Sequence, residues 1–355
     1  MRLSSLLPFL FASTGLAALP FKGVDWSSLL IEEKAGRTYK TTSGQTQPLE
    51  NILKSSGVNT VRQRLWVNPS DGNYNLDYNI NLAKRAHAAG LKIYLNMHFS
   101  DTWADPAHQT TPVAWKSLSR DALVKQVYDY TKSVMDRFQK EGLPLPTVSI
   151  GNEITTGMLW PIGQLSKTDG YKNCAMLLKS ASNAIKESSI SPKPKIMIHL
   201  DNGWNWGTQQ SWYDKILSSG GGLSAGDYDI QGVSYYPFYN SAATLNSLGS
   251  SLSSMANKYG KEIQVVETNW PTYCPNPASA FPSDTKSIPL SVEGQTQWMK
   301  QVASKVTGIG SLGTGLFYWE PAWIDNAGLG SSCGWNLMVT DLGQAMDSLA
   351  VFNSI

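Results

Sequence analysis

The sequence is short of charged residues, cysteines and long apolar runs, and each shortage excludes a class of protein. Lys, Arg, Asp and Glu together make up only 16% of the 355 residues, against about 25% in an ordinary soluble domain. A formal net charge of +2 excludes a protein that binds nucleic acid through an excess of positive charge. No run of 18 apolar residues is present, so we expect no membrane-spanning helix.

Cysteine and histidine lack the spacings of metal sites. Cys174, Cys274 and Cys333 form no C-x-x-C pair, which excludes a zinc ribbon or a thioredoxin-type motif. Their odd number allows at most one internal disulfide and leaves one thiol over. The four histidines, at positions 87, 98, 108 and 199, show no H-x-x-x-H spacing. We therefore expect neither a metal site nor a cofactor.

Tryptophan, in contrast, is abundant. The chain contains 13 Trp, and 41% of its residues are hydrophobic. Low charge together with many such residues is typical of a globular protein and argues against a disordered chain. An excess of indole rings on a weakly charged protein favours an uncharged ligand that stacks on flat rings.

The first seventeen residues have the pattern of a secretory signal peptide. Arg2 supplies a positive charge, residues 3–11 are mostly apolar, and Gly15 and Ala17 are small residues suited to a cleavage site. The alternative interpretation is an N-terminal core helix. We expect residues 1–17 to be removed on secretion and residues 18–355 to form one extracellular domain, in which a disulfide can form.

Eight short apolar, β-branched runs recur along the chain, and each gap between them has room for a loop and a helix. In one gap, Ser119 can cap a helix whose apolar positions run from Leu123 to Phe138. Strands alternating with helices predict a parallel sheet in an α/β fold. Eight such units favour a single (β/α)8 TIM barrel over an open doubly wound sheet. The runs are 23–27, 60–67, 92–99, 147–153, 195–201, 230–236, 262–268 and 314–320.

Polar side chains cluster at the C-terminal ends of these runs, where TIM barrels carry their chemistry. Glu153 and Glu267 follow strongly apolar runs at the fourth and seventh ends. A carboxylate beside a buried strand is costly unless it is hydrogen-bonded or used. Structural ion pairs are the alternative, but Arg, His and Trp at the other strand ends argue against them.

Two carboxyl groups across a barrel mouth are the arrangement of a glycoside hydrolase. One carboxyl protonates the leaving oxygen; the other attacks the anomeric carbon at a separation of about 5–5.5 Å, or activates water if it is farther away. Arg62 would keep the nucleophile ionised, and burial would keep the acid protonated.

Two other motif matches lack the context that their chemistry needs. Residues 222–226 match G-x-S-x-G, but a Gly/Ser loop precedes them and a strand follows, the reverse of a nucleophile elbow. Residues 308–313 match G-x-G-x-x-G, but here the glycines follow a helix and precede a strand. We expect neither an esterase nor a dinucleotide site.

Several segments together resemble the arabinogalactan endo-β-1,4-galactanases of glycoside hydrolase family 53, most closely the secreted fungal ones. The segment through Asp105 and Pro106 is the most specific, whereas Asn152-Glu153 is shared with a wider clan of retaining glycosidases. The resemblance extends over nearly the whole secreted chain. The matching segments are 23–27, 59–67, 95–106, 150–154, 266–271 and 317–323.

The resemblance implies roles for individual residues. Glu153 would be the acid/base and Glu267 the nucleophile of a retaining, endo-acting enzyme that cleaves β-1,4-galactosidic bonds in type I arabinogalactan, the galactan of pectin. Arg62 would pair with Glu267, and either Tyr235 or Tyr236 would orient it. The residues expected to bind substrate are Arg62, Trp66, Asn96, His98, Asp101, Trp103, Asn152, Asp201, Tyr236 and Trp319.

The cysteines mark a departure from the bacterial members of that family, which are expected to bind calcium between the loops after strands 7 and 8. Cys274 and Cys333 lie in those loops here, so the resemblance implies a Cys274–Cys333 disulfide in place of the metal. Cys174 would then be a free, buried thiol.

The expected partner is the galactan polysaccharide, bound by a monomer, with no nucleic acid and no membrane. Two alternatives stay open at this point. One is another endo-polysaccharidase of the same clan, such as a mannanase or a glucanase. The other is a non-catalytic barrel that only binds carbohydrate.

Overall fold

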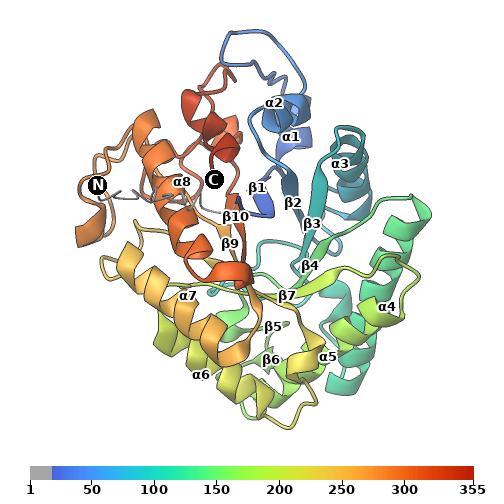
Figure 1. The fold of residues 1–355 in the computed structure, drawn as a ribbon. Helices are drawn as coiled ribbons and strands as arrows, with labels where there is room; N and C mark the ends of the chain where they lie inside the picture. Colours follow the sequence, from blue (N-terminus) through green and yellow to red (C-terminus); the bar gives the residue numbers. More distant parts are fainter. Residues whose placement is uncertain (1–17) are drawn as a thin grey trace, which may run out of the picture.

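Eight parallel strands close into a barrel with helices around it, in the computed structural model that describes residues 18–355 (Figure 1). The expected signal peptide lies outside the described residues. The barrel strands are β1 (Phe21–Asp25), β2 (Thr60–Leu65), β3 (Lys92–Met97), β4 (Thr147–Ile150), β7 (Lys195–Leu200), β8 (Ile230–Ser234), β9 (Glu262–Glu267) and β10 (Gly313–Tyr318).

The order of the strands confirms the predicted TIM barrel. They follow one another around the barrel as β1-β10-β9-β8-β7-β4-β3-β2. Because β1 pairs in parallel with both β2 and β10, for example through Val24 opposite Val61 and Tyr318, the sheet has no free edge. An open doubly wound sheet, the alternative considered from the sequence, would leave two edges. Strand labels β5 (Gly157–Met158) and β6 (Gly163–Gln164) belong to a small antiparallel hairpin after β4.

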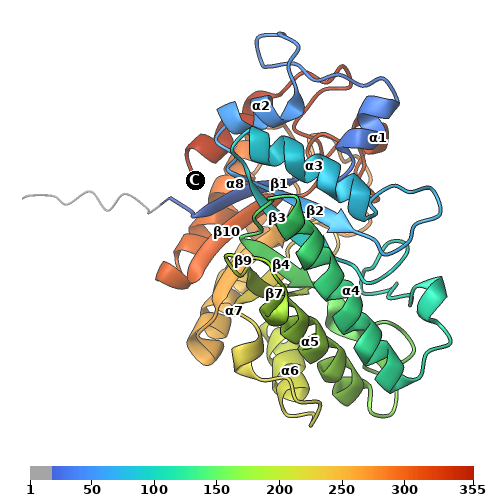
Figure 2. The same ribbon diagram turned by 90° about the vertical axis from the view of Figure 1, so that its right-hand side faces the viewer.

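Amphipathic helices cover the outside of the barrel (Figures 1 and 2). In α4, Ser119 accepts a hydrogen bond from the backbone N–H of Ala122, and Leu123, Val127 and Phe138 lie on the buried face. The predicted cap and apolar stripe are thus confirmed. The helices are α1 (Leu29–Lys34), α2 (Leu49–Ser55), α3 (Leu76–Ala88), α4 (Arg120–Lys140), α5 (Gly170–Glu187), α6 (Trp206–Leu217), α7 (Leu245–Tyr259) and α8 (Val292–Thr307).

The barrel interior is packed with side chains rather than open. Tyr94, Met197, Ile230, Val266 and Phe317 form a fully buried cluster contributed by five strands. Such a layer closes the lower part of the barrel and leaves the polar side chains at the C-terminal strand ends as the floor of the mouth.

The fourth strand ends earlier than its sequence predicts. It was expected over residues 147–153, but β4 stops at Ile150. Gly151 has φ 129° and Glu153 has φ 48°, and these left-handed conformations turn the chain out of the sheet. The turn places Glu153 on the barrel rim instead of within the strand.

Candidate active site

The predicted site residues largely converge on one cleft of about 510 Å³ at the barrel mouth. Its lining residues lie within or just after β2, β3, β4, β7, β8, β9 and β10. This placement at the C-terminal half of the barrel is where the fold carries its functional sites. Nine of the residues predicted from the sequence line it: Arg62, His98, Trp103, Asn152, Glu153, Asp201, Tyr236, Glu267 and Trp319.

Glu267 lies at the last position of β9 and is 6% exposed. Arg62 Nη2 donates a hydrogen bond to its Oε1 at 2.6 Å, and the Tyr236 hydroxyl donates to its Oε2 at 2.9 Å. The pairing of β8 with β9 shifts register between Val233 and Ser234. Such an irregularity re-aims the residues that follow it, and Tyr236 is among them.

The choice between two tyrosines is decided by this geometry. Tyr235 is fully buried and its hydroxyl donates to the carbonyl oxygen of Ala243, away from the carboxylates. Tyr236 faces the cleft and holds Glu267. Adjacent residues at a strand end point in opposite directions, so only one of the pair can reach the site.

Glu153 is half-buried in the same cleft and has no arginine or lysine ion-pair partner among the described residues. Burial raises its pKa well above the usual value, and the negative charges of Glu267 and Asp201 add to the shift. Burial also raises the pKa of Glu267, but the positive charge of Arg62 and the Tyr236 hydrogen bond oppose that shift. Glu267 therefore ionises first and Glu153 keeps its proton, the division that an acid and a nucleophile require.

Asn152, next to Glu153 in the chain, is held from several sides. Its Oδ1 accepts hydrogen bonds from Arg62 Nη2 at 2.7 Å and from His199 Nδ1 at 3.0 Å, and its Nδ2 donates to the carbonyl oxygen of Ala104 at 2.6 Å. These bonds fix the orientation of the amide. His199, near the end of β7, is thereby linked to the site through Asn152.

Three residues predicted to bind substrate lie outside the cleft lining. Asn96 is fully buried behind Asn152, with its amide 2.7 Å from the Asn152 amide oxygen. Trp66 is 7% exposed and donates its indole N–H to His98 Nδ1. Asp101 accepts the backbone N–H groups of Asn68 and Val113 and so ties two loops together. Position at or after a strand end, within segments that resemble the family, does not tell a residue that lines the cleft from one that supports it.

Arg64 is a component of the site whose role sequence reasoning missed. It is 1% exposed, pairs with Glu320 Oε1 at 2.6 Å, and lies with its guanidinium carbon 4.6 Å and 5.1 Å from the ring centroids of Trp103 and Trp323. Cation–π contact of this kind holds both rings in place. Burial raises the pKa of Glu320 to about 7, against the lowering effect of Arg64.

Two cleft residues that were not predicted from the sequence, Phe238 and Tyr239, come from the loop after β8, and Tyr239 is 55% exposed. Ser234 at the end of β8 and Trp204 after β7 also line the cleft. Loop residues carry no periodic pattern, so only the folded chain shows which of them face inward.

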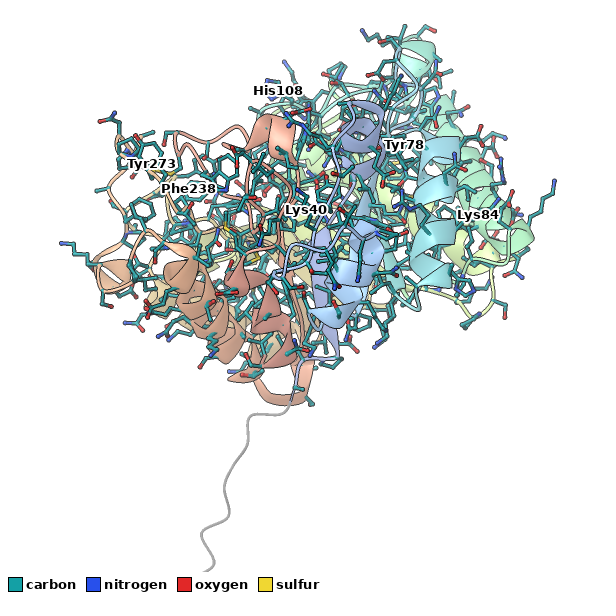
Figure 3. The ribbon with its side chains drawn as sticks, turned by 90° about the horizontal axis from the view of Figure 1, so that it is seen from above. Lys40, Tyr78, Lys84, His108, Phe238 and Tyr273 are labelled. Carbon is teal, nitrogen blue, oxygen red and sulfur yellow. A yellow bond between two sulfur atoms is a disulfide. The ribbon has the colours of Figure 1, made fainter. Side chains whose placement is uncertain are left out.

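The expected disulfide is present between Cys274 and Cys333, and Cys174 is a free, buried thiol. Phe238 packs against the disulfide, with Tyr236 next to it. Figure 3 shows Phe238 and Tyr273 near each other at the left of the view, with His108 farther toward its top. Among residues 18–355, no cluster of three His, Cys, Asp or Glu side chains could hold a metal ion, and no helix has the length and apolarity to cross a membrane.

Comparison with known proteins places this architecture in a family. The sequence profile described as Glycosyl hydrolase family 53 matches residues 21–352. An arabinogalactan endo-beta-1,4-galactanase of Thermothelomyces thermophilus is 59% identical over 338 residues, which cover 95% of this chain and 100% of that protein. A probable arabinogalactan endo-beta-1,4-galactanase A of Aspergillus fumigatus is 58% identical and covers 99% of this chain and 98% of its own.

Solved structures give the same result. A fungal beta-1,4-galactanase structure superposes with a TM-score of 0.93 at 58% identity, covering 95% of this chain and 100% of that one. The family 53 catalytic domain of Ignisphaera aggregans has a TM-score of 0.83 at 29% identity, covering 96% and 97% of the two chains. The chain thus belongs to glycosyl hydrolase family 53.

Proposed function

We propose that this enzyme is a retaining endo-β-1,4-galactanase that hydrolyses type I arabinogalactan. The observation that carries the proposal is the unequal treatment of two carboxyl groups in one cleft. Arg62 and Tyr236 bind Glu267 directly, whereas Glu153 has no Arg or Lys ion-pair partner among residues 18–355 and is influenced by the carboxylates of Glu267 and Asp201. The substrate class follows from the relatives, whose names specify galactan.

In the first half of the reaction, Glu267 attacks the anomeric carbon while Glu153 donates its proton to the departing glycosidic oxygen. The C–O bond breaks and a galactosyl ester forms on Glu267. In the second half, Glu153 takes a proton from water, the water oxygen attacks the same carbon, and Glu267 leaves as a carboxylate. Two inversions at one carbon return the original configuration.

The remaining groups position the sugar. Asn152 lies beside Glu153, where it would hydrogen-bond the 2-hydroxyl of the sugar at the cleavage point, an interaction that strengthens in the transition state. Trp319 would form the floor of that subsite, with Trp103 adjacent at a centroid distance of 6.1 Å. Indole faces suit the apolar faces of galactose rings.

We further propose that the protein acts outside the cell as a monomer. The pattern of residues 1–17 supports export, and a disulfide in the mature domain fits an oxidising compartment. Mass spectrometry of the N-terminus of protein recovered from culture medium tests this. A mature N-terminus near Ala18 supports secretion, and retention of Met1 would contradict it.

The substrate is tested by incubating the protein with galactan, mannan and glucan and measuring new reducing ends. Release from galactan alone is the expected result, and products of several lengths at early times would indicate endo cleavage. Activity on mannan but not galactan would overturn the substrate assignment. Binding to a polysaccharide without hydrolysis would indicate a carbohydrate-binding barrel. The matched control is Glu267→Gln, which keeps the shape of the site and removes the nucleophile.

A further inference from the structure

The guanidinium group of Arg64 is buried beside the cleft and held by polar partners at both of its terminal nitrogens. Nη1 donates to Glu320 Oε1 at 2.6 Å and lies 3.6 Å from Asp25 Oδ1, and Nη2 donates to Ser28 Oγ at 2.6 Å. Charge-assisted hydrogen bonds of this kind add geometric specificity as well as energy. They fix the position of the guanidinium plane.

Three aromatic rings contact the same guanidinium group. Its central carbon lies 4.2 Å from the ring centroid of Tyr74, 4.6 Å from that of Trp103 and 5.1 Å from that of Trp323. The planes of Trp103 and Trp323 are 20° apart, with centroids separated by 6.1 Å. Both distances from Arg64 are well above half of that separation, so the cation lies to one side of this pair of rings and contacts both.

Of these three rings, Trp103 is the one that lines the catalytic cleft. It lies in the loop after β3, where no strand pairing sets the direction of a side chain. Trp66 and Trp319 meet it edge-on, at centroid distances of 5.5 Å and 6.1 Å. The orientation of the Trp103 ring therefore depends on its side-chain neighbours, and Arg64 is the charged one among them.

A guanidinium group suits this position better than an ammonium group. It is planar and weakly hydrated, so its faces can stack on rings while its N–H groups donate to oxygens. Arg64 is 1% exposed, and a cation attracts an aromatic ring more strongly when water is excluded. Lysine would supply the charge but not the flat surface that reaches both indoles.

We propose that Arg64 is a positioning residue for substrate binding, which holds the Trp103 ring in the orientation that stacks on a galactosyl ring of the polymer. A ring that is already held loses little rotamer freedom when the sugar binds, so affinity gains from preorganisation. Arg64 acts through Trp103 and takes no part in the proton transfers or in the attack by Glu267. The proposal rests on the proposed function, because it takes galactan as the ligand.

The angle between Trp103 and Trp319 determines which step Arg64 affects. Their planes are 68° apart, so both cannot stack flat on one face of the same sugar. With Trp319 under the galactosyl unit that is cleaved, Trp103 serves a neighbouring unit of the chain. Loss of the Trp103 orientation should therefore weaken binding of the polymer more than it slows the chemical step.

The test is a double-mutant cycle on galactan with Arg64→Lys, Trp103→Ala and the variant that carries both changes. Arg64→Lys should raise KM about threefold to tenfold, the size of a cation–π contact, with little change in kcat. In the Trp103→Ala background the same change should raise KM by no more than about twofold, because the ring through which Arg64 acts is gone. Calorimetric titration of galactotetraose into the same variants carrying Glu267→Gln should show the same pattern in the dissociation constant.

A matched control separates this effect from a general loss of stability. Arg85 on α3 pairs with Glu33 and Glu50 outside the barrel, and Arg85→Lys should leave KM at the wild-type value. An equal rise of KM in Arg85→Lys would indicate a merely structural effect and overturn the proposal. Equal effects of Arg64→Lys with and without Trp103 would overturn it too, as would a lower kcat at an unchanged KM.

A second variant keeps the proposal testable if Arg64→Lys fails to fold. Arg64→Met with Glu320→Gln removes both charges of the buried pair together, so neither partner is left alone. The same dependence on Trp103 is expected. A wild-type enzyme inactive on galactan would refute the proposed function, whereas normal cleavage with additive effects of the Arg64 and Trp103 changes would refute only this inference.

Discussion

Arg62 Nη2 lies 2.6 Å from Glu267 Oε1 while Nη1 of the same side chain lies 2.6 Å from Asp25 Oδ2, so one buried guanidinium serves two carboxylates. All three side chains are nearly inaccessible to solvent. Removal of one partner of a buried ion pair leaves the others uncompensated. The nucleophile is thus held ionised by a group whose own position depends on a second acidic residue at the end of β1.

The hydroxyl of Tyr236 should matter to catalysis in a way that the hydroxyl of Tyr235 does not. Tyr236→Phe removes a hydrogen bond to the charged Glu267, and bonds of that kind contribute about 1.5–3 kcal/mol. We expect kcat to fall about tenfold to a hundredfold. Steady-state kinetics on galactan measures this, and Tyr235→Phe, which removes only the bond to Ala243, is the matched control. Equal losses in the two variants would contradict the assigned role.

Azide should distinguish the two glutamates by the configuration of the product. Glu267→Ala should lose nearly all turnover, and azide should restore cleavage of an activated aryl galactobioside with formation of the α-azide, because a single displacement inverts the carbon. Glu153→Ala should be slowed about 10²–10⁴-fold on galactan, which needs an acid. With azide it should give the β-azide. Proton NMR of the isolated azides reads the configuration, and exchanged outcomes would reverse the two roles.

Glu320 should make the protein less stable as the pH rises from about 4.5 to 7. Its pKa is raised to about 7 in the folded state, so the folded protein binds a proton there that the unfolded chain has released. The extra proton bound by folded Glu320 stabilises the protein fully at a pH below the pKa of Glu320 in the unfolded chain. This stabilisation is lost as the pH rises through the pKa of Glu320 in the folded protein. The full effect is about 3 kcal/mol at most.

Urea denaturation of the wild type and Glu320→Gln at pH 4.5 and pH 7.5 measures this contribution. The variant cannot titrate at this position and should show a smaller loss of stability between the two values. Identical pH dependence in both proteins would show that Glu320 ionises normally. Arg64, which pairs with Glu320, stays charged between these two pH values, so it adds no pH dependence of its own to the free energy of unfolding.

The Cys274–Cys333 disulfide should stabilise the fold and support the cleft. It closes a loop between residues 59 apart, and the chain-entropy relation gives a contribution of about 4 kcal/mol for a loop of that size. The double variant Cys274→Ser/Cys333→Ser should have a lower denaturation midpoint than the wild type. Adding a reductant should not change the midpoint of the double variant. Peptide mapping without reduction should recover the two cysteines together. A bridge that contained Cys174 would contradict the structure.

The fold and the two glutamates were predictable because both depend on local patterns. Short apolar strand runs recur eight times along the chain with room for a helix between them, and Glu153 and Glu267 stand out because each is a charge beside an apolar run. Asn96, Trp66 and Asp101 share the strand-end position without lining the cleft. The direction in which a side chain points at a strand end depends on small twists and register shifts of the strand, and a sequence pattern does not encode these.

By itself, the sequence determined the barrel, the acidic pair and the cysteines available for a disulfide, because each follows from the composition or from the spacing of apolar runs along the chain. Only the tertiary structure decided that Tyr236 rather than Tyr235 binds Glu267, that Arg64 fixes the Trp103 ring, and that His199 connects Asn152 to Ser234. These contacts join residues from different strands or the loops that follow them, and the Arg62–Glu267 pair joins residues 205 positions apart. Such neighbours exist only after the barrel closes, because closure alone brings all eight strand ends to one rim.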